Sequence, residues 1–159
     1  MIQKILNPQT CANCKICCNY SINSLWDIPG FTLKEYKQII TYYPQYKSIS
    51  YCKNNLYYFK TIPTDNDKYL CPFLADNGCT LGNNKPFKCA IWPFYVVKYK
   101  NNIYLAQSDV CPNLQLISKQ MLTNGLETTI TKIKKIINQN PELIESYRPH
   151  FSLIIQLDI

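Results

Sequence analysis

The stretch Cys11-Ala12-Asn13-Cys14-Lys15-Ile16-Cys17-Cys18 places four cysteines within eight residues. A C-x-x-C segment can turn back on itself so that both sulfurs meet one ion, and this spacing occurs twice in succession here. Thiolates are soft ligands that select zinc, copper(I) or iron–sulfur clusters. The stretch therefore predicts a metal centre around which the rest of the fold is organised.

The adjacent pair Cys17-Cys18 limits how these thiols can be used. Neighbouring side chains on an extended backbone point in opposite directions. We therefore expect Cys17 and Cys18 to serve two separate sites, or two atoms of one larger cluster, and not one mononuclear ion.

Further cysteines follow later in the chain. Three closely spaced cysteines can hold three corners of a cubane, whose fourth ligand is a distant cysteine that is often followed by proline. Two segments have this form, Cys71-Pro72 and Cys111-Pro112, and the turn signal Asp76-Asn77-Gly78 is expected to bring Cys71 towards Cys79. The predicted ligands, for metal or cluster, are Cys11, Cys14, Cys17, Cys18, Cys71, Cys79, Cys89 and Cys111.

Two segments with similar sequences predict β-hairpins. Residues 51–58 and 98–105 each carry aromatic or branched residues on both sides of an Asn-Asn pair, and asparagine tolerates positive φ. We expect two-residue turns at Asn54-Asn55 and Asn101-Asn102, and both hairpins in one small antiparallel sheet. Cys52 aligns with Tyr99, so we interpret it as a strand residue outside the ligand set.

Helical signals occur on both sides of the hairpins. Thr32-Leu33-Lys34-Glu35 is a capping box, which predicts a helix that ends at Pro44. Its apolar face comprises Leu33, Tyr36, Ile39, Ile40 and Tyr43.

The C-terminal part also has helical periodicity. Residues 114–122 and 128–138 predict two helices separated by Asn124-Gly125, and Pro141 can start a short third one that ends by Pro149. The apolar tail 151–159 fits a strand, a helix or a partner contact.

These elements predict a small α+β, metal-centred domain with short antiparallel hairpins. Its 159 residues suit a single domain (1–159), with a cysteine-cluster region at 11–112 and a helical extension at 113–159.

Composition narrows the compartment and the partners. The N-terminus lacks a signal-peptide pattern, and the longest apolar run, residues 90–97, is too short to span a membrane. We therefore expect a cytoplasmic protein with no membrane partner, in which nine cysteines are better explained by metal than by disulfides.

The formal charge of +7 invites comparison with nucleic-acid-binding proteins. Arg148 is the sole arginine among the 17 basic residues, whereas base and phosphate recognition favours the arginine fork. The lysines are also spread along the chain. We interpret them as a solvated surface and expect no nucleic-acid partner.

The cysteine motifs together resemble the CxxCxxCC cysteine-cluster family, the YkgJ-type zinc- or iron-chelating domains. The family pattern continues with C-x-F-L, a further cysteine, and R-P-x-x-C-R-x-F-P. This chain matches it over residues 11–112, with Lys85, Ala90 and Trp92 at three positions where the family has Arg, Arg and Phe. The resemblance implies a metal-chelating domain, and a flagellin lysine-N-methylase carries a related cluster.

Three functions are compatible with these observations. The first is an iron–sulfur protein with all-cysteine ligation of [4Fe–4S] type and an electron-transfer or accessory role, acting with a protein redox or substrate partner. The second is a structural zinc protein with two four-cysteine sites. The third is a cluster-dependent enzyme similar to protein-lysine methyltransferases, although no glycine-rich nucleotide loop is present and His150 is the lone histidine. Catalytic residues are not identified.

Overall fold

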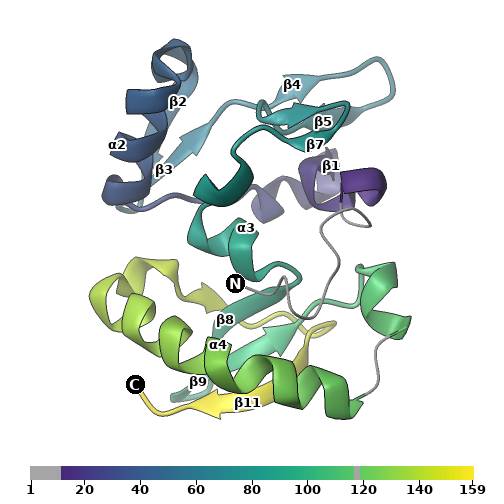
Figure 1. The fold of residues 1–159 in the computed structure, drawn as a ribbon, viewed down its shortest axis with the longest axis vertical. Coiled ribbons are helices and arrows are strands. Elements are labelled where there is room, and N and C mark those ends of the chain that lie inside the picture. Colours follow the sequence, from purple (N-terminus) through teal and green to yellow (C-terminus); the bar gives the residue numbers. More distant parts are fainter. Residues whose placement is uncertain (1–11, 117–118) are drawn as a thin grey trace. The chain divides into compact units, whose positions relative to one another are not determined.

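The structure, a computed structural model, describes residues 12–116 and 119–159 (Figure 1). Contacts between Cα atoms divide the chain into two compact units. We call Cys11–Cys89 the cysteine unit and Ala90–Ile159 the sheet unit. Helices and mainly antiparallel sheets are both present, so the predicted α+β class is confirmed. The boundary falls at residues 89–90, whereas the sequence placed the end of the cysteine-cluster region at 112.

The cysteine unit consists of short elements connected by turns. Its helical elements are η1 (Ile16–Cys18), η2 (Ile22–Asp27), α2 (Leu33–Tyr42), η3 (Pro44–Ile49), η4 (Gly82–Asn84) and the start of α3 (Phe87–Ile91). Its strands are β1 (Asn19–Ser21), β2 (Ser50–Lys53), β3 (Leu56–Phe59), β4 (Ile62–Pro63), β5 (Lys68–Leu70), β6 (Leu74–Ala75) and β7 (Gly78–Cys79). They form a three-stranded sheet, β1-β5-β4, and two separate hairpins, β2-β3 and β6-β7.

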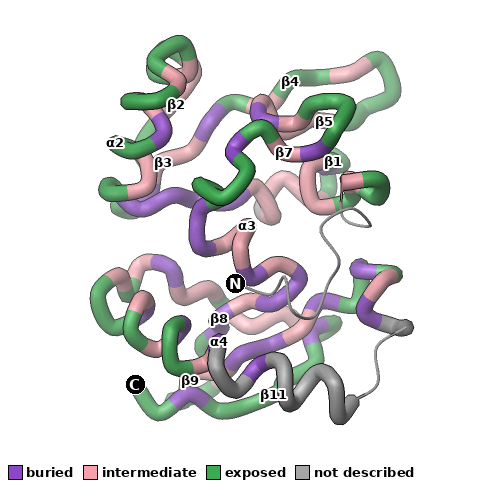
Figure 2. Tube along the Cα trace, in the orientation of Figure 1, coloured by how far each residue is buried: buried purple, intermediate pink, exposed green. Residues whose placement is uncertain are grey.

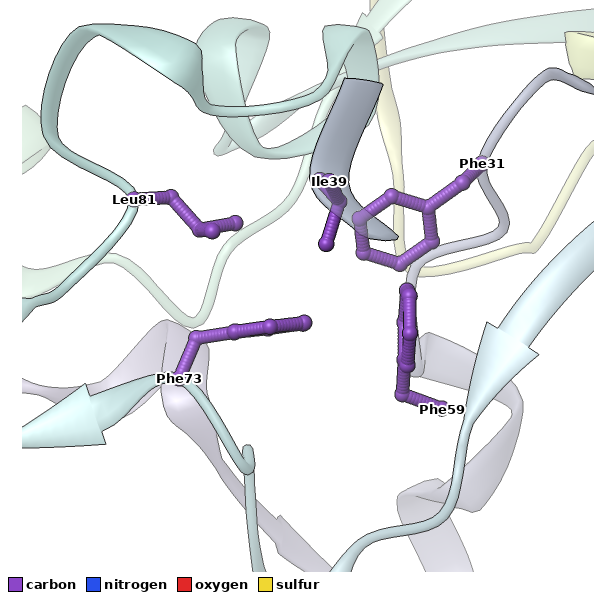
Figure 3. Packing of buried hydrophobic residues seen from close by; sticks show 5 residues of the cluster. All are labelled: Phe31, Ile39, Phe59, Phe73 and Leu81. Carbon is purple, nitrogen blue, oxygen red and sulfur yellow. The ribbon is translucent and has the colours of Figure 1, made fainter. Parts of the chain in front are cut away.

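An aromatic cluster forms the core of the cysteine unit (Figure 3). Phe59 packs edge-to-face against Phe31 and Phe73, with ring centroids 5.1 and 4.9 Å away. Ile39 of α2 and Leu81 complete the buried set, and Cys71 and Cys79 pack against its border. The core therefore lies directly beside two of the predicted ligands.

Helix α2 begins where the capping box predicts. The Thr32 side chain accepts a hydrogen bond from the Glu35 backbone N–H, while the Glu35 carboxylate accepts one from the Thr32 backbone N–H at 2.8 Å. Ile39 is buried, as expected, but Leu33 is 46% exposed, so its assignment to the buried face is wrong. The residues of α2 that pack in or against the aromatic cluster are Tyr36, Ile39 and Ile40, and Leu33 in the first turn is not among them.

The sheet unit is built from longer elements. It contains β8 (Phe94–Tyr99), β9 (Asn102–Gln107), η5 (Pro112–Leu116), α4 (Lys119–Gln139), η6 (Pro141–Leu143), β10 (Glu145–Ser146) and β11 (Ser152–Leu157). The strand order is β10-β8-β9-β11, with β10 parallel to β8 and the other pairs antiparallel. Figure 1 shows α4 running alongside this sheet, and Ile133 and Ile137 of α4 are fully buried.

Both predicted hairpins are present, but two details were wrong. The β2-β3 turn is Asn54-Asn55, with φ of 51° and 62°, as predicted. The β8-β9 turn is Lys100-Asn101, one residue earlier than expected, because Tyr99 pairs with Asn102. The hairpins also belong to different sheets, since β8 and β9 pair with β10 and β11 instead.

The C-terminal part differs from the predicted pair of helices. Helix α4 continues through Asn124-Gly125 without a break. A glycine inside a helix costs about 1 kcal/mol relative to alanine, which the burial of Leu126, Ile133 and Ile137 outweighs. The short helix at Pro141 is confirmed as η6, although it already ends at Leu143, and the tail is the strand β11. The extension 113–159 is thus not wholly helical.

Candidate metal centre

Five cysteines of the cysteine unit come together from three parts of the sequence. Cys17 and Cys18 end η1, and their sulfur atoms are 3.8 Å apart. Cys71 follows strand β5, and its backbone N–H donates to the carbonyl of Cys18 at 2.9 Å. The Cys71 thiol raises the pKa of Cys18, and Cys79 and Cys89 interact electrostatically with Cys17 and Cys18.

The close approach of the two neighbouring thiols overturns the expectation that they point apart. That expectation assumed an extended backbone, whereas Cys17 and Cys18 lie in a 3₁₀ turn. Lys15 precedes the turn in the left-handed region, with φ of 56°, and this reverses the chain direction. Both thiols therefore lie on the same side of the segment.

The β6-β7 hairpin positions Cys79. Its turn is Asp76-Asn77, and Gly78 follows with φ of 102°, as the turn signal predicts. After the hairpin, the backbone N–H groups of Leu81 and Gly82 donate hydrogen bonds to the Cys79 sulfur. Hydrogen bonds of this kind favour the thiolate form, which is the form that binds metals.

Cys89 lies on the short helix α3, which is tied to helix α2. The Glu35 carboxylate accepts a hydrogen bond from the backbone N–H of Phe87 at 2.6 Å. The other oxygen of the same carboxylate caps α2 at Thr32. One side chain thus fixes the first residue of α3, two positions before Cys89.

Crowding and burial raise the pKa of Cys17, Cys18, Cys79 and Cys89 and so favour their protonated forms. The hydrogen bond with Cys18, and then burial, raise the pKa of Cys17 far above its ordinary value. The hydrogen bond with Cys17 lowers the pKa of Cys18, but the interaction with Cys71 and burial outweigh this and raise it to about 12. Burial and the neighbouring thiols raise the pKa of Cys89. Metal binding here must therefore release protons.

Two residues near the thiols were not assigned to the site from sequence. Lys85 lowers the pKa of Cys17, Cys79 and Cys89 and so supplies positive charge beside them. Tyr20 is buried on β1, and burial followed by the nearby thiols raises the pKa of its phenol. Lys85 stands in the family-like Lys-Pro motif, whereas no sequence signal marks Tyr20.

Tyr20, Cys71 and Phe73 also line a small apolar pocket of about 10 Å³, together with Phe31 and Phe59. A cavity of this size has room for at most one water molecule. It is therefore not a site for a substrate.

The remaining cysteines are placed differently. Cys14 is exposed, and Cys11 lies outside the described residues. Cys111 is buried in the sheet unit. Cys52 is exposed on strand β2 opposite Tyr57, which confirms its interpretation as a strand residue.

The donor set has the chemistry of a soft-metal site. It consists of thiols from η1, the end of β5, β7 and α3, with backbone N–H groups and one lysine around them. Among residues 12–116 and 119–159, no group of three or more His, Cys, Asp or Glu side chains is arranged to hold a metal ion. The thiols converge, therefore, without forming a closed coordination shell.

Helices in the described parts of the chain are too short or too polar to cross a bilayer. Comparison of the sequence and the structure with family models, curated proteins and solved structures finds no significant match.

Proposed function

We propose that the cysteine unit binds an iron–sulfur cluster of [4Fe–4S] type through cysteine thiolates, and that the protein has an electron-transfer or accessory role with a protein partner. The observation that supports this most is the convergence of Cys17, Cys18, Cys71, Cys79 and Cys89 from three parts of the sequence. The proposed ligands are drawn from these five together with Cys11 and Cys14, the other cysteines of the N-terminal cluster in the sequence.

The surroundings of the thiols suit a redox centre. Backbone N–H groups of Leu81 and Gly82 reach the Cys79 sulfur, and Lys85 offsets negative charge. Phe73 and Tyr20 are buried nearby and limit the access of water. Hydrogen bonds to sulfur, local charge and solvent access are the features that set the reduction potential of such a centre. A bound cluster would supply the one-electron couple.

Structural zinc is the second candidate, and one distance favours it. Two sulfurs on one tetrahedral zinc, with bonds of about 2.3 Å, are roughly 3.8 Å apart. The Cys17 and Cys18 sulfurs have this separation. In that case, two four-cysteine sites would contribute folding free energy and no redox chemistry.

Metal analysis and absorption spectroscopy on anaerobically purified protein distinguish the two candidates. For the cluster, we expect brown protein with iron and acid-labile sulfide in equal amounts, and a broad visible absorption that bleaches on reduction. A colourless preparation with about two zinc ions per chain would contradict the cluster and support the zinc sites.

Two serine variants test the site itself. Cys18→Ser should lose most of the bound metal, because Cys18 lies between Cys17 and Cys71. Cys52→Ser is the matched control and should keep all of it, because Cys52 is exposed on a strand of the β2-β3 hairpin. Full metal content in Cys18→Ser, or its loss in Cys52→Ser, would show that the metal is bound elsewhere.

A further inference from the structure

Two of the candidate ligands, Cys18 and Cys71, lie directly opposite each other on neighbouring segments. Strands β1 and β5 are antiparallel, with Asn19 opposite Leu70, and the same register places Cys18 opposite Cys71. The backbone N–H of Cys71 donates to the carbonyl of Cys18 at 2.9 Å, so the pairing continues past the end of β1. Residues that face each other across an antiparallel pair carry their side chains on the same side of the sheet. The two thiols therefore lie beside each other.

The spacing of this pair suits a disulfide. Opposite residues that are joined by a backbone hydrogen bond in an antiparallel pair have Cα atoms about 5.5 Å apart. The Cα atoms of disulfide-bonded cysteines are usually roughly 4.4–6.8 Å apart. A bond between Cys18 and Cys71 thus requires little movement of the backbone.

The neighbouring pair Cys17-Cys18 is less suited to a disulfide, although its sulfur atoms are 3.8 Å apart. Consecutive Cα atoms across a trans peptide are about 3.8 Å apart, which is below the range that disulfides use. A bond between these two sulfurs would require the backbone to distort. Of its two neighbours, Cys71 is therefore the better partner for Cys18 on oxidation.

We propose that a peroxide oxidises Cys18 and Cys71 to a disulfide when the metal is absent, and that this disulfide prevents metal from binding. The inference rests on the proposed function, because it describes how metal binding to the same thiols is controlled. Metals bind the thiolate, and a disulfide removes two of them. Disulfides in reducing compartments are usually transient and redox-sensing, and this one is of that kind.

The reaction consumes one peroxide molecule for each disulfide. One sulfur, as the thiolate, attacks an oxygen of the peroxide; the O–O bond breaks and leaves a sulfenic acid and a water molecule. The second sulfur attacks the sulfenic sulfur, the S–O bond breaks, the S–S bond forms and a second water molecule leaves. The two thiols lose two hydrogen atoms and two electrons in total, which the peroxide accepts. A dithiol reverses the reaction by thiol–disulfide exchange.

The disulfide also stabilises the metal-free cysteine unit. It closes the loop 18–71, which contains α2 and the β2-β3 hairpin. Closing a long loop restricts the unfolded chain and so favours the folded one. We therefore expect amides of α2 to exchange more slowly in the oxidised metal-free chain than in the reduced metal-free chain.

Peptide mapping on the full chain tests the pairing without a variant. A chelator removes the metal under reducing conditions, the reductant is removed, and one equivalent of hydrogen peroxide is added at mildly alkaline pH, where thiolates are more abundant. We expect the chain to lose two hydrogen atoms, and fragment spectra to join Cys18 to Cys71. The oxidised chain should take up about tenfold less Zn²⁺ than the reduced chain, and dithiothreitol should restore the uptake.

Two serine variants assign the bond. Cys71→Ser should prevent it, and Cys52→Ser is the matched control that should keep it. Cys52 lies opposite Tyr57 and is exposed, as is most of its strand β2 (Figure 2).

A metal-binding chain in which the peroxide forms no bond, or joins other cysteines, would overturn this inference and leave the proposed function intact. So would Zn²⁺ uptake that is unchanged after Cys18 and Cys71 have been joined. A chain that contains no metal when purified and takes up no Zn²⁺ when reduced would contradict the proposed function, and the control of metal binding with it.

Discussion

The two units of this chain are built on different principles. In the sheet unit, β8, β9 and β11 have six residues each, and the 21-residue helix α4 contributes fully buried isoleucines. In the cysteine unit, strands have two to four residues, and five side chains form the core cluster. Long strands and a long helix hold the first together, whereas the second packs short elements around an aromatic cluster with thiols at its border.

This difference assigns different sources of stability to the two units. Small domains with little core need disulfides, metals or oligomerisation to remain folded. The five converging cysteines of the cysteine unit are reduced thiols. If our proposal is correct, bound metal supplies what the short strands cannot, and the sheet unit does not need it.

Removal of the metal should therefore have the largest effect, and only on the cysteine unit. Structural metal–thiolate sites contribute on the order of 10 kcal/mol to folding. After chelation under reducing conditions, amides of β1–β7 should exchange rapidly, while those of β8, β9 and α4 keep their protection. Hydrogen exchange with mass spectrometry measures both units in one sample.

The second-largest effects are expected from matched truncations in the cores of the two units. Phe73 and Phe94 are each 1% exposed, one in each unit. Replacing a buried phenylalanine by alanine costs about 3–5 kcal/mol. Phe73→Ala should lower the exchange protection of the cysteine unit and speed the loss of metal. Phe94→Ala should lower the exchange protection of the strands of the sheet unit and leave the rate of metal loss unchanged. Equal loss of protection in both units from either variant would show that they unfold as one.

Local signals were sufficient to predict several elements of both units. The capping box at Thr32 and the Asn54-Asn55 turn depend on hydrogen bonds and φ preferences within a few residues. Features decided by distant partners were predicted wrongly. Asn124-Gly125 stays helical because α4 buries its apolar side chains. The two hairpins belong to different sheets because β8 and β9 pair with β10 and β11.

The candidate site was partly predictable for the same reason. Cysteine spacing identified the thiols, because few other uses explain such a pattern in reduced form. The relation between Cys17 and Cys18 was wrong, since it depends on the left-handed backbone at Lys15, which a lysine does not signal. Tyr20 was missed because strand β1 is three residues long, which is too short for its alternation of exposed and buried residues to be recognised from the sequence.

The smallest predicted effect concerns the carboxylate that joins the helices of the cysteine unit. Glu35 accepts hydrogen bonds from the backbone N–H groups of Thr32 and Phe87, at 2.8 and 2.6 Å. Hydrogen bonds to a charged group contribute about 1.5–3 kcal/mol, and a neutral amide keeps part of this. Glu35→Gln should therefore lower the stability of the cysteine unit by roughly 1–2 kcal/mol in denaturant titrations followed by absorbance of the bound metal.

Lys34→Ala is the control for this substitution, because Lys34 is exposed on the same helix and should change stability by less than about 0.5 kcal/mol. Because Glu35 fixes the start of the helix that carries Cys89, Glu35→Gln should also release metal faster to a chelator than Lys34→Ala does. Equal stability and equal release rates in the two variants would mean that Cys89 is held by its metal alone. The two helices would then be stabilised independently, and the metal–thiolate bonds alone would hold the helix that carries Cys89 in place.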